Sequence, residues 1–165
     1  ILDAGKALTT ANGAHVFTDQ FTAILINMTG TGATIGLVIY MFFFAKSQQT
    51  KQLGRLAIVP SIFNINEPVI YGTPIVMNPF LFIPFVLTPV VIGLLDYSLM
   101  SAGVLPLFSG VQVPWTTPPI ISGFILGGWK LALAQVANII ISCLIYFSFI
   151  RKVDNINYEK EKAAK

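Results

Sequence analysis

The sequence has few charged residues. Only 10% of its 165 residues are charged, against roughly 25% in an ordinary soluble domain. Between residues 56 and 150 the only charged side chains are Glu67, Asp96 and Lys130. A water-exposed surface cannot be built from so few charges, and the chain is too apolar to be disordered. The sequence therefore predicts an integral membrane protein.

Further absences exclude other classes. The net charge of +3 comes from lysines and arginines that flank the apolar runs, so no basic patch follows the phosphates of a nucleic acid. The single cysteine, Cys143, has no second cysteine for an internal disulfide. No Cys, His or carboxylate cluster has the spacing of metal ligands, and no phosphate-binding loop or nucleophile motif occurs. We therefore expect neither a metal nor a cofactor.

The beginning of the chain also lacks familiar features. The first residue is Ile1, not Met, and residues 1–20 have neither the basic start nor the apolar run of a signal peptide. We therefore expect the chain to be a piece of a longer protein or a processed product.

Apolar residues, by contrast, make up 55% of the chain. A helix needs about 20 of them to cross the hydrocarbon core of a bilayer. Three charge-free runs reach that length, residues 21–45, 75–95 and 131–150, and we predict a transmembrane helix for each. Residues 46–55 form a predicted polar loop with basic residues and no acid, which is typical of the cytoplasmic side. Residues 151–165 begin with Arg and Lys and are expected to be a frayed or linking cytoplasmic tail after a membrane transport domain.

Polar and small residues recur at helical spacing within two of these runs. In the first run four of them share one predicted helix face: Asn27, Gly30, Thr31 and Thr34. Gly32 and Gly36 add a small-xxx-small spacing that is typical of helix packing. In the last run an inward-facing stripe is predicted for Gln135, Asn138 and Ser142. The first face fits either a packing seam or the wall of a polar cavity.

Two apolar stretches between these runs are interrupted. Residues 56–73 contain Pro60 and Pro68, and residues 97–128 contain four prolines and five glycines. Irregular backbone at membrane depth occurs only where protein buries it or where it lines a wet cavity. Two broken segments that enter from opposite sides are typical of a transporter binding site near the bilayer midplane. The predicted fold class is thus an all-α membrane protein with transmembrane helices and two re-entrant hairpins of opposite orientation.

Glu67 is the most informative residue of the first broken stretch. An acid inside a membrane costs at least ~2.5 kcal/mol on insertion scales, so such residues usually face a pathway. Asp96 lies at the border of a predicted span, which leaves Glu67 as the only ionisable residue inside the predicted membrane stretches. Asn64 and Asn66 beside it, with no cation nearby, favour a cavity for a neutral hydroxylated ligand. The alternative is an interfacial Glu at the end of a short helix.

Trp115 is the corresponding candidate in the second broken stretch. It stands between prolines and is followed by Thr116 and Thr117. Its rigidly held ring could pack on the C–H face of a sugar while the threonine hydroxyls contact sugar hydroxyls. The alternative is a tryptophan of the interfacial belt, which is our interpretation of Trp129. His15 is expected to be a loop or packing residue.

Residues 63–79, with the sequence FNINEPVIYGTPIVMNP, resemble the signature of the IIC component of sugar phosphotransferase systems, most closely the lactose/cellobiose/diacetylchitobiose branch. Residues 15–19, 30–36 and 113–123 resemble that branch in the same order. The resemblance implies a homodimer in the bacterial inner membrane that takes up a β-linked disaccharide. It also implies that a phosphocysteine of the cytosolic IIB partner, which is supplied through IIA, phosphorylates the 6-hydroxyl of the sugar.

The resemblance assigns roles to particular residues. Asn66 and Glu67 correspond to the sugar-binding pair of the family, and Trp115 corresponds to its stacking tryptophan. Glu67 would orient the 6-hydroxyl and accept its proton. The chain would be the C-terminal part of the transport domain, without the helices that form the dimer. It would also lack an upstream histidine of the family, and His15 does not take over the role of that histidine.

Two other functions remain open at the level of the sequence. The chain could belong to an ion-coupled secondary transporter or a channel, with Glu67 as the proton or cation site. It could also be a structural membrane bundle with an interfacial Glu67. The choice among cellobiose, chitobiose and lactose is open too.

Overall fold

The computed structural model describes residues 19–108 and 111–164 of the chain. These residues form helices and connecting segments, with no strand among them. The elements in chain order are α1 (Asp19–Phe21), the π-helix η2 (Thr22–Ile26), α2 (Ile35–Phe43), α3 (Gln48–Ile62), α4 (Glu67–Gly72), the 3-10 helix η3 (Ile75–Met77), α5 (Pro79–Ser101) and α6 (Ile121–Ala163).

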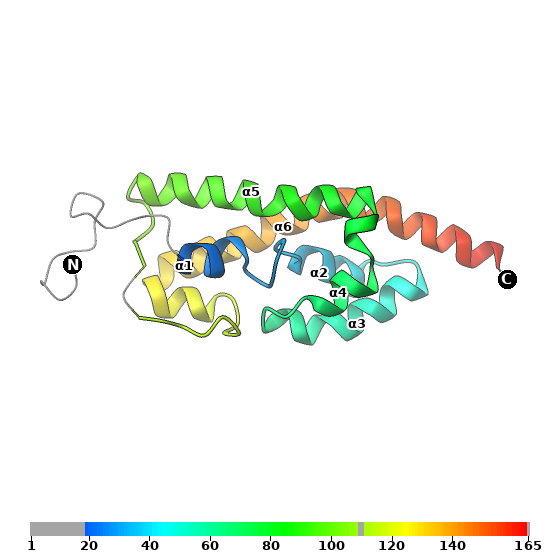
Figure 1. The fold of residues 1–165 in the computed structure, drawn as a ribbon, viewed down its shortest axis with the longest axis horizontal. Coiled ribbons are helices and arrows are strands. Elements are labelled where there is room, and N and C mark those ends of the chain that lie inside the picture. The colour runs from blue at the N-terminus through cyan, green and yellow to red at the C-terminus, as the bar shows by residue number, and fades with distance from the viewer. Residues whose placement is uncertain (1–18, 109–110, 165) are drawn as a thin grey trace, which may run out of the picture.

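The long helix α6 is the central element of the described structure. It packs against α5 on one side and against α2 on the other, and it also contacts α3 (Figure 1). Helices α3 and α4 lie side by side, with the break between them at residues 63–66. Most of the buried apolar side chains therefore gather along α6, in one cluster with α2 and α5 and in another around η2.

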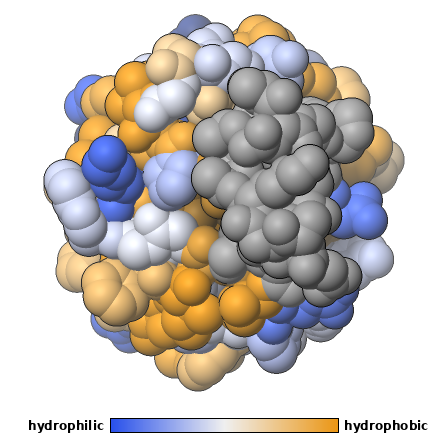
Figure 2. All heavy atoms as spheres, turned by 90° about the vertical axis from the view of Figure 1, so that its left-hand side faces the viewer, coloured by the Kyte–Doolittle hydropathy of each residue, from blue (hydrophilic) through white to orange (hydrophobic). Residues whose placement is uncertain are grey.

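The distribution of polarity is that of a membrane protein. Helices α5 and α6 are long and apolar enough to cross a membrane. Large hydrophobic side chains such as Phe82, Leu94 and Leu144 are exposed, whereas Gln135 and Asn138 are fully buried. Figure 2 views one end of the molecule, and hydrophobic residues lie at its surface beside hydrophilic ones. The predicted inward stripe on residues 131–150 is confirmed.

The predicted continuous helix over residues 21–45 is wrong. The chain leaves the helical conformation after Ile26 and returns to it only at Ile35. Between them four residues adopt positive φ angles: Thr29 (66°), Gly30 (94°), Gly32 (84°) and Ala33 (48°). The four polar residues therefore do not share a helix face. The packing role expected at Gly36 is correct, since a Cβ there would lie 2.4 Å from the backbone carbon of Ser142 in α6.

Both interrupted stretches are broken, as predicted. The first ends α3 at Ile62 and resumes as α4 at Glu67. The second is irregular over residues 102–108 and 111–120 and breaks again at Gly128, whose φ of 69° and ψ of −160° separate residues 121–127 from the rest of α6. The side-chain oxygen of Gln135 accepts hydrogen bonds from the amides of Ile120 (2.6 Å) and Gly123 (3.0 Å), which holds that short helical piece against the following one.

Two predictions about the polar ends need correction. Residues 46–55 are not a loop, because α3 begins at Gln48 with Ser47 as its N-cap. The tail is not frayed, because α6 continues to Ala163. Asp154 explains part of this order: its buried carboxylate accepts hydrogen bonds from the Tyr40 hydroxyl (3.2 Å) and from the amides of Lys46 (2.8 Å) and Ser47 (3.1 Å).

Candidate functional site

A cavity of about 230 Å³ lies where three irregular segments meet. One wall comes from η2 and the loop after it, another from the break between α3 and α4, and the third from the irregular stretch before α6. The residues that line it are Ala23, Asn27, Gly30, Thr31, Asn64, Asn66, Glu67 and Trp115. The fold thus brings together four of the five site residues predicted from the sequence, although they come from segments about 50 residues apart along the chain.

Side chains from distant segments stabilise the loop at residues 27–34. Ser142 donates to the carbonyl of Ala33 (2.6 Å) and accepts from the amide of Gly36 (3.0 Å), and Tyr146 donates to the carbonyl of Gly32 (2.7 Å). These contacts satisfy backbone groups that a helix would have paired internally. The open conformation of this loop is what leaves room for the cavity.

Asn64 joins all three walls. Its side-chain oxygen accepts a hydrogen bond from the amide of Thr29 (2.9 Å), and its side-chain nitrogen donates to the carbonyls of Trp115 and Thr117. Both amide protons are thereby used. Asn64, which itself has a φ of 63°, positions the walls and holds the backbone of Trp115.

Asn66 is buried and packs under the loop. Its side-chain nitrogen donates to the carbonyl of Thr31 (2.7 Å) and to the hydroxyl of Thr34 (3.1 Å), so its side-chain oxygen is the group left to accept from a ligand. The fit is close: a Cβ on Gly30 would lie 2.4 Å from the Asn66 Cγ. Gly30 is therefore required both by its positive φ and by this contact.

Glu67 and Trp115 are both exposed residues of the cavity lining. Glu67 is the first residue of α4, is exposed, and makes no hydrogen bond or ion pair with any other described residue. The Trp115 side chain is 61% exposed and also borders a smaller cavity of about 170 Å³ beside Asp19 and Gln112. Thr116 is half-buried and is not among the lining residues. His15 lies outside the described residues.

Asp96 is a second acid within an apolar helix, and its position differs from the expected one. We expected Asp96 at the end of a span, but α5 continues past it to Ser101 and buries it completely. The Asn138 side-chain nitrogen donates to its Oδ2 at 2.6 Å. Asp96 follows Ile92 and Thr88 at intervals of four on one buried face, a spacing that could have indicated its burial.

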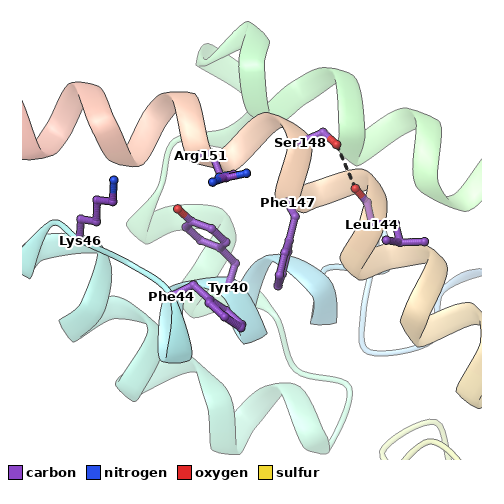
Figure 3. A pocket seen from close by; sticks show the side chains of 7 residues that line it. All are labelled: Tyr40, Phe44, Lys46, Leu144, Phe147, Ser148 and Arg151. Carbon is purple, nitrogen blue, oxygen red and sulfur yellow. Dashed lines mark hydrogen bonds between the residues drawn. The ribbon is translucent and has the colours of Figure 1, made fainter.

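A larger cavity, of about 550 Å³, lies between the end of α2 and α6 (Figure 3). Tyr40, Phe44 and Phe147 form aromatic walls, and Lys46 and Arg151 border it from two sides. It contains none of the residues predicted for the site. The smaller cavity is therefore the one that unites the free carboxylate, the accessible indole and the amide oxygen.

Comparisons with known proteins all point to the same kind of protein. The family model described as "Phosphotransferase system, EIIC" matches residues 2–89. The chain is 49% identical over 148 residues to the lichenan permease IIC component of Bacillus subtilis (strain 168), which covers 88% of the chain and 33% of that protein. It is 47% identical over 152 residues to the cellobiose-specific EIIC component of the PTS system of Geobacillus stearothermophilus. That match covers 91% of this chain and 33% of the relative.

The fold is similar to a solved structure as well. The crystal structure of the transporter ChbC, the IIC component from the N,N'-diacetylchitobiose-specific phosphotransferase system, matches with a TM-score of 0.86 and 43% identity. The match covers 92% of this chain and 36% of that one. The chain thus spans about a third of the length of the relatives it matches.

Proposed function

The chain belongs to the phosphotransferase system EIIC family, and on that basis we propose that it carries the sugar-binding site of a permease for a β-linked disaccharide. Members of this family are membrane-embedded sugar permeases. The relatives named above are a lichenan permease component and components specific for cellobiose and diacetylchitobiose, and the sugar units of all three compounds are joined by β-linkages. The cavity at the helix breaks is the proposed site, and the substrate is proposed to be a disaccharide of that kind.

The observation that carries this proposal is the convergence of Asn66, Glu67 and Trp115 on one cavity. An exposed indole offers an apolar face to the C–H face of a sugar ring, and a free amide oxygen and a carboxylate accept hydrogen bonds from hydroxyls. The same residues were expected to bind sugar from the sequence, Asn66 and Glu67 in residues 63–79 and Trp115 in residues 113–123. Asn64 acts indirectly, because its hydrogen bonds hold the walls, and Thr116 is proposed only as a contact at the edge.

Glu67 is the proposed acceptor of a proton in the reaction that follows uptake. The oxygen of the sugar 6-hydroxyl attacks the phosphorus of the phosphocysteine on IIB, the P–S bond breaks, and the cysteine thiolate of IIB leaves. The hydroxyl proton passes to the Glu67 carboxylate. Phosphoryl transfer depends mainly on positioning, so the permease contributes an oriented hydroxyl and a nearby base, and no phosphorylated residue of its own.

The arrangement in the membrane is part of the proposal. Helix α5 and the long part of α6 would cross the bilayer of the bacterial inner membrane in opposite directions. The α3–α4 pair and residues 102–127 would be re-entrant hairpins from opposite sides that meet at the cavity. Residues 46–55 and the end of α6 would face the cytoplasm, where IIB and IIA operate. A homodimer would form through segments outside this chain.

The test separates binding from transfer. In the complete protein, Glu67→Gln keeps a hydrogen-bonding side chain but cannot accept the proton. We expect sugar binding to be retained in part, while phosphorylation of bound disaccharide by phosphorylated IIB falls ~10²-fold or more. Glu159→Gln, which changes an exposed acid near the end of α6, is the matched control and should leave both unchanged.

Each other outcome has a definite meaning. Transfer at the unmodified rate would show that Glu67 is structural. Loss of binding and transfer together would make Glu67 a sugar anchor and not a base. Accumulation of unmodified sugar that follows an ion gradient and needs no IIB would contradict the phosphotransferase proposal and favour an ion-coupled carrier.

A further inference from the structure

Asp96 and Asn138 form an isolated polar pair between α5 and α6. Both side chains are fully buried, and the Asn138 side-chain nitrogen donates to the Asp96 Oδ2 at 2.6 Å. The other carboxylate oxygen of Asp96 and the side-chain oxygen of Asn138 have no hydrogen-bond partner among the described residues. The pair therefore has one hydrogen bond and two buried oxygens that receive no donor.

Complete burial limits what can satisfy these oxygens. Because Asp96 has no exposed surface, its surroundings are made by this chain and not by lipid or by another segment of a longer protein. The elements packed against α5 are α6, η2 and η3. Neither η2 nor η3 contains a charged or titratable residue.

On α6 the charged groups nearest in sequence to Asn138 are Lys130 and Arg151, and both are exposed. The titratable Tyr146 donates its proton to the carbonyl of Gly32, and Cys143 is half-buried. No cation from these described elements balances an ionised Asp96. An unpaired charge in such surroundings would be very costly.

We infer that Asp96 is a proton-binding site, and that its neutral carboxyl group donates a hydrogen bond from Oδ1 to the side-chain oxygen of Asn138. One proton then satisfies both unpartnered oxygens. The acid and the amide form a ring of two hydrogen bonds, one in each direction, and no charge is buried. The pair links α5 to α6 one turn from Gln135, whose side-chain nitrogen donates to the carbonyl of Ile24 at 3.0 Å in the segment beside the cavity.

Asp154 provides an internal comparison. It is equally buried but accepts three hydrogen bonds, from one hydroxyl and two backbone amides. The two aspartates therefore differ in their hydrogen-bond donors: Asp154 has three, whereas Asp96 has one and needs a proton to satisfy its other oxygen.

Infrared spectroscopy of the complete protein in membranes tests the inference. A protonated carboxyl group has a C=O stretching band separate from that of a carboxylate. We expect Asp96→Asn to remove one protonated-carboxyl band at neutral pH. The control, Asp154→Asn, changes an equally buried aspartate and should leave that band in place.

Thermal unfolding of the same variants completes the test. Asparagine at position 96 has the donor and the acceptor that a neutral acid has, so the melting temperature of Asp96→Asn should stay within about 3 °C of the unmodified protein. Asp96→Leu, which leaves both polar groups of Asn138 unpaired, should unfold at a clearly lower temperature. The inference is overturned if Asp96→Asn leaves the protonated-carboxyl bands unchanged, or if that variant does not fold, because a required negative charge would then be missing.

Discussion

We call the contact surfaces of α6 the α6 seams. Polar residues at the cavity and at the α6 seams differ in their burial and in their hydrogen bonds. At the cavity, Glu67 is exposed and unpartnered by any described residue, while Asn64 and Asn66 use their amides to hold irregular backbone. At the α6 seams, Asp96 and Asp154 are fully buried and hydrogen-bonded: Asp96 pairs with Asn138 between α5 and α6, and Asp154 accepts from the connection between α2 and α3. Glu67 and Asp96 both lie in apolar stretches, but Glu67 directly follows a break in the backbone, whereas Asp96 lies inside a continuous helix.

The comparison predicts which property each variant loses. Residues of the α6 seams should affect the stability of the protein before they affect its affinity for sugar. Residues of the cavity should do the reverse. The following changes test this division, in order of decreasing expected effect.

The largest effect is expected for Asp154→Ala at the α6 seams. The change leaves the Tyr40 hydroxyl and the amides of Lys46 and Ser47 without their acceptor. The free energy of unfolding should fall by about 3 kcal/mol or more, because three donors, two of them in buried residues, would lose their acceptor at once. Chemical or thermal denaturation in detergent measures this, with the exposed neighbour Asn155→Ala as the control. Equal stability of the two variants would show that the buried carboxylate contributes nothing.

Two glycines offer a direct comparison of the regions. In Gly36→Ala the new Cβ meets the backbone of Ser142, which cannot move aside without parting α2 from α6, so we expect a stability loss of ~1–3 kcal/mol. In Gly30→Ala the Cβ meets the side chain of Asn66, which can rotate away. We expect that variant to fold but to lose sugar affinity.

The control for both is Gly103→Ala. Gly103 also has a positive φ, of 76°, but a Cβ there meets no atom within 4 Å. It should lose only the ~1–2 kcal/mol of backbone strain and keep its sugar affinity. If Gly30→Ala bound sugar as well as Gly103→Ala, the loop at residues 27–34 would have no part in the site.

A smaller effect is expected at the tryptophan. By analogy with the stacking of bases on aromatic side chains, Trp115→Ala should weaken disaccharide binding by ~1–3 kcal/mol, and Trp115→Phe should weaken it less. Because the Asn64 contact uses the backbone carbonyl of Trp115, neither change should disturb the wall. Binding titrations measure the affinity, and unchanged affinity in both variants would rule out stacking.

The smallest effect is expected at Thr116. It is half-buried and lies outside the lining of the cavity. Thr116→Val keeps the shape of the side chain and removes the hydroxyl. Affinity should change by less than about 0.5 kcal/mol, as for most substitutions away from a packed or hydrogen-bonded feature. A loss as large as that of Trp115→Ala would make the hydroxyl a direct sugar ligand.

Much of the cavity could be predicted from the sequence. Both breaks lie within the stretches where they were expected: the first falls at residues 63–66, between Pro60 in α3 and Pro68 in the first turn of α4, and the second includes Gly128. Asn66, Glu67 and Trp115 were proposed from those breaks and from the resemblance of residues 63–79 and 113–123. The loop at residues 27–34 could not be predicted, because its polar residues also fit the period of a helix.

The sequence by itself determined the membrane class, the apolar helices and the two proline- and glycine-rich breaks, because composition and backbone chemistry are local properties. Only the tertiary structure decided that residues 27–34 open, that Asn64 is a positioning residue and that Asp96 is buried. Each of these depends on a hydrogen-bond partner far along the chain, such as Ser142 for Ala33, Thr29 for Asn64 and Asn138 for Asp96. A backbone group freed from its helix is stable at membrane depth only when such a partner reaches it.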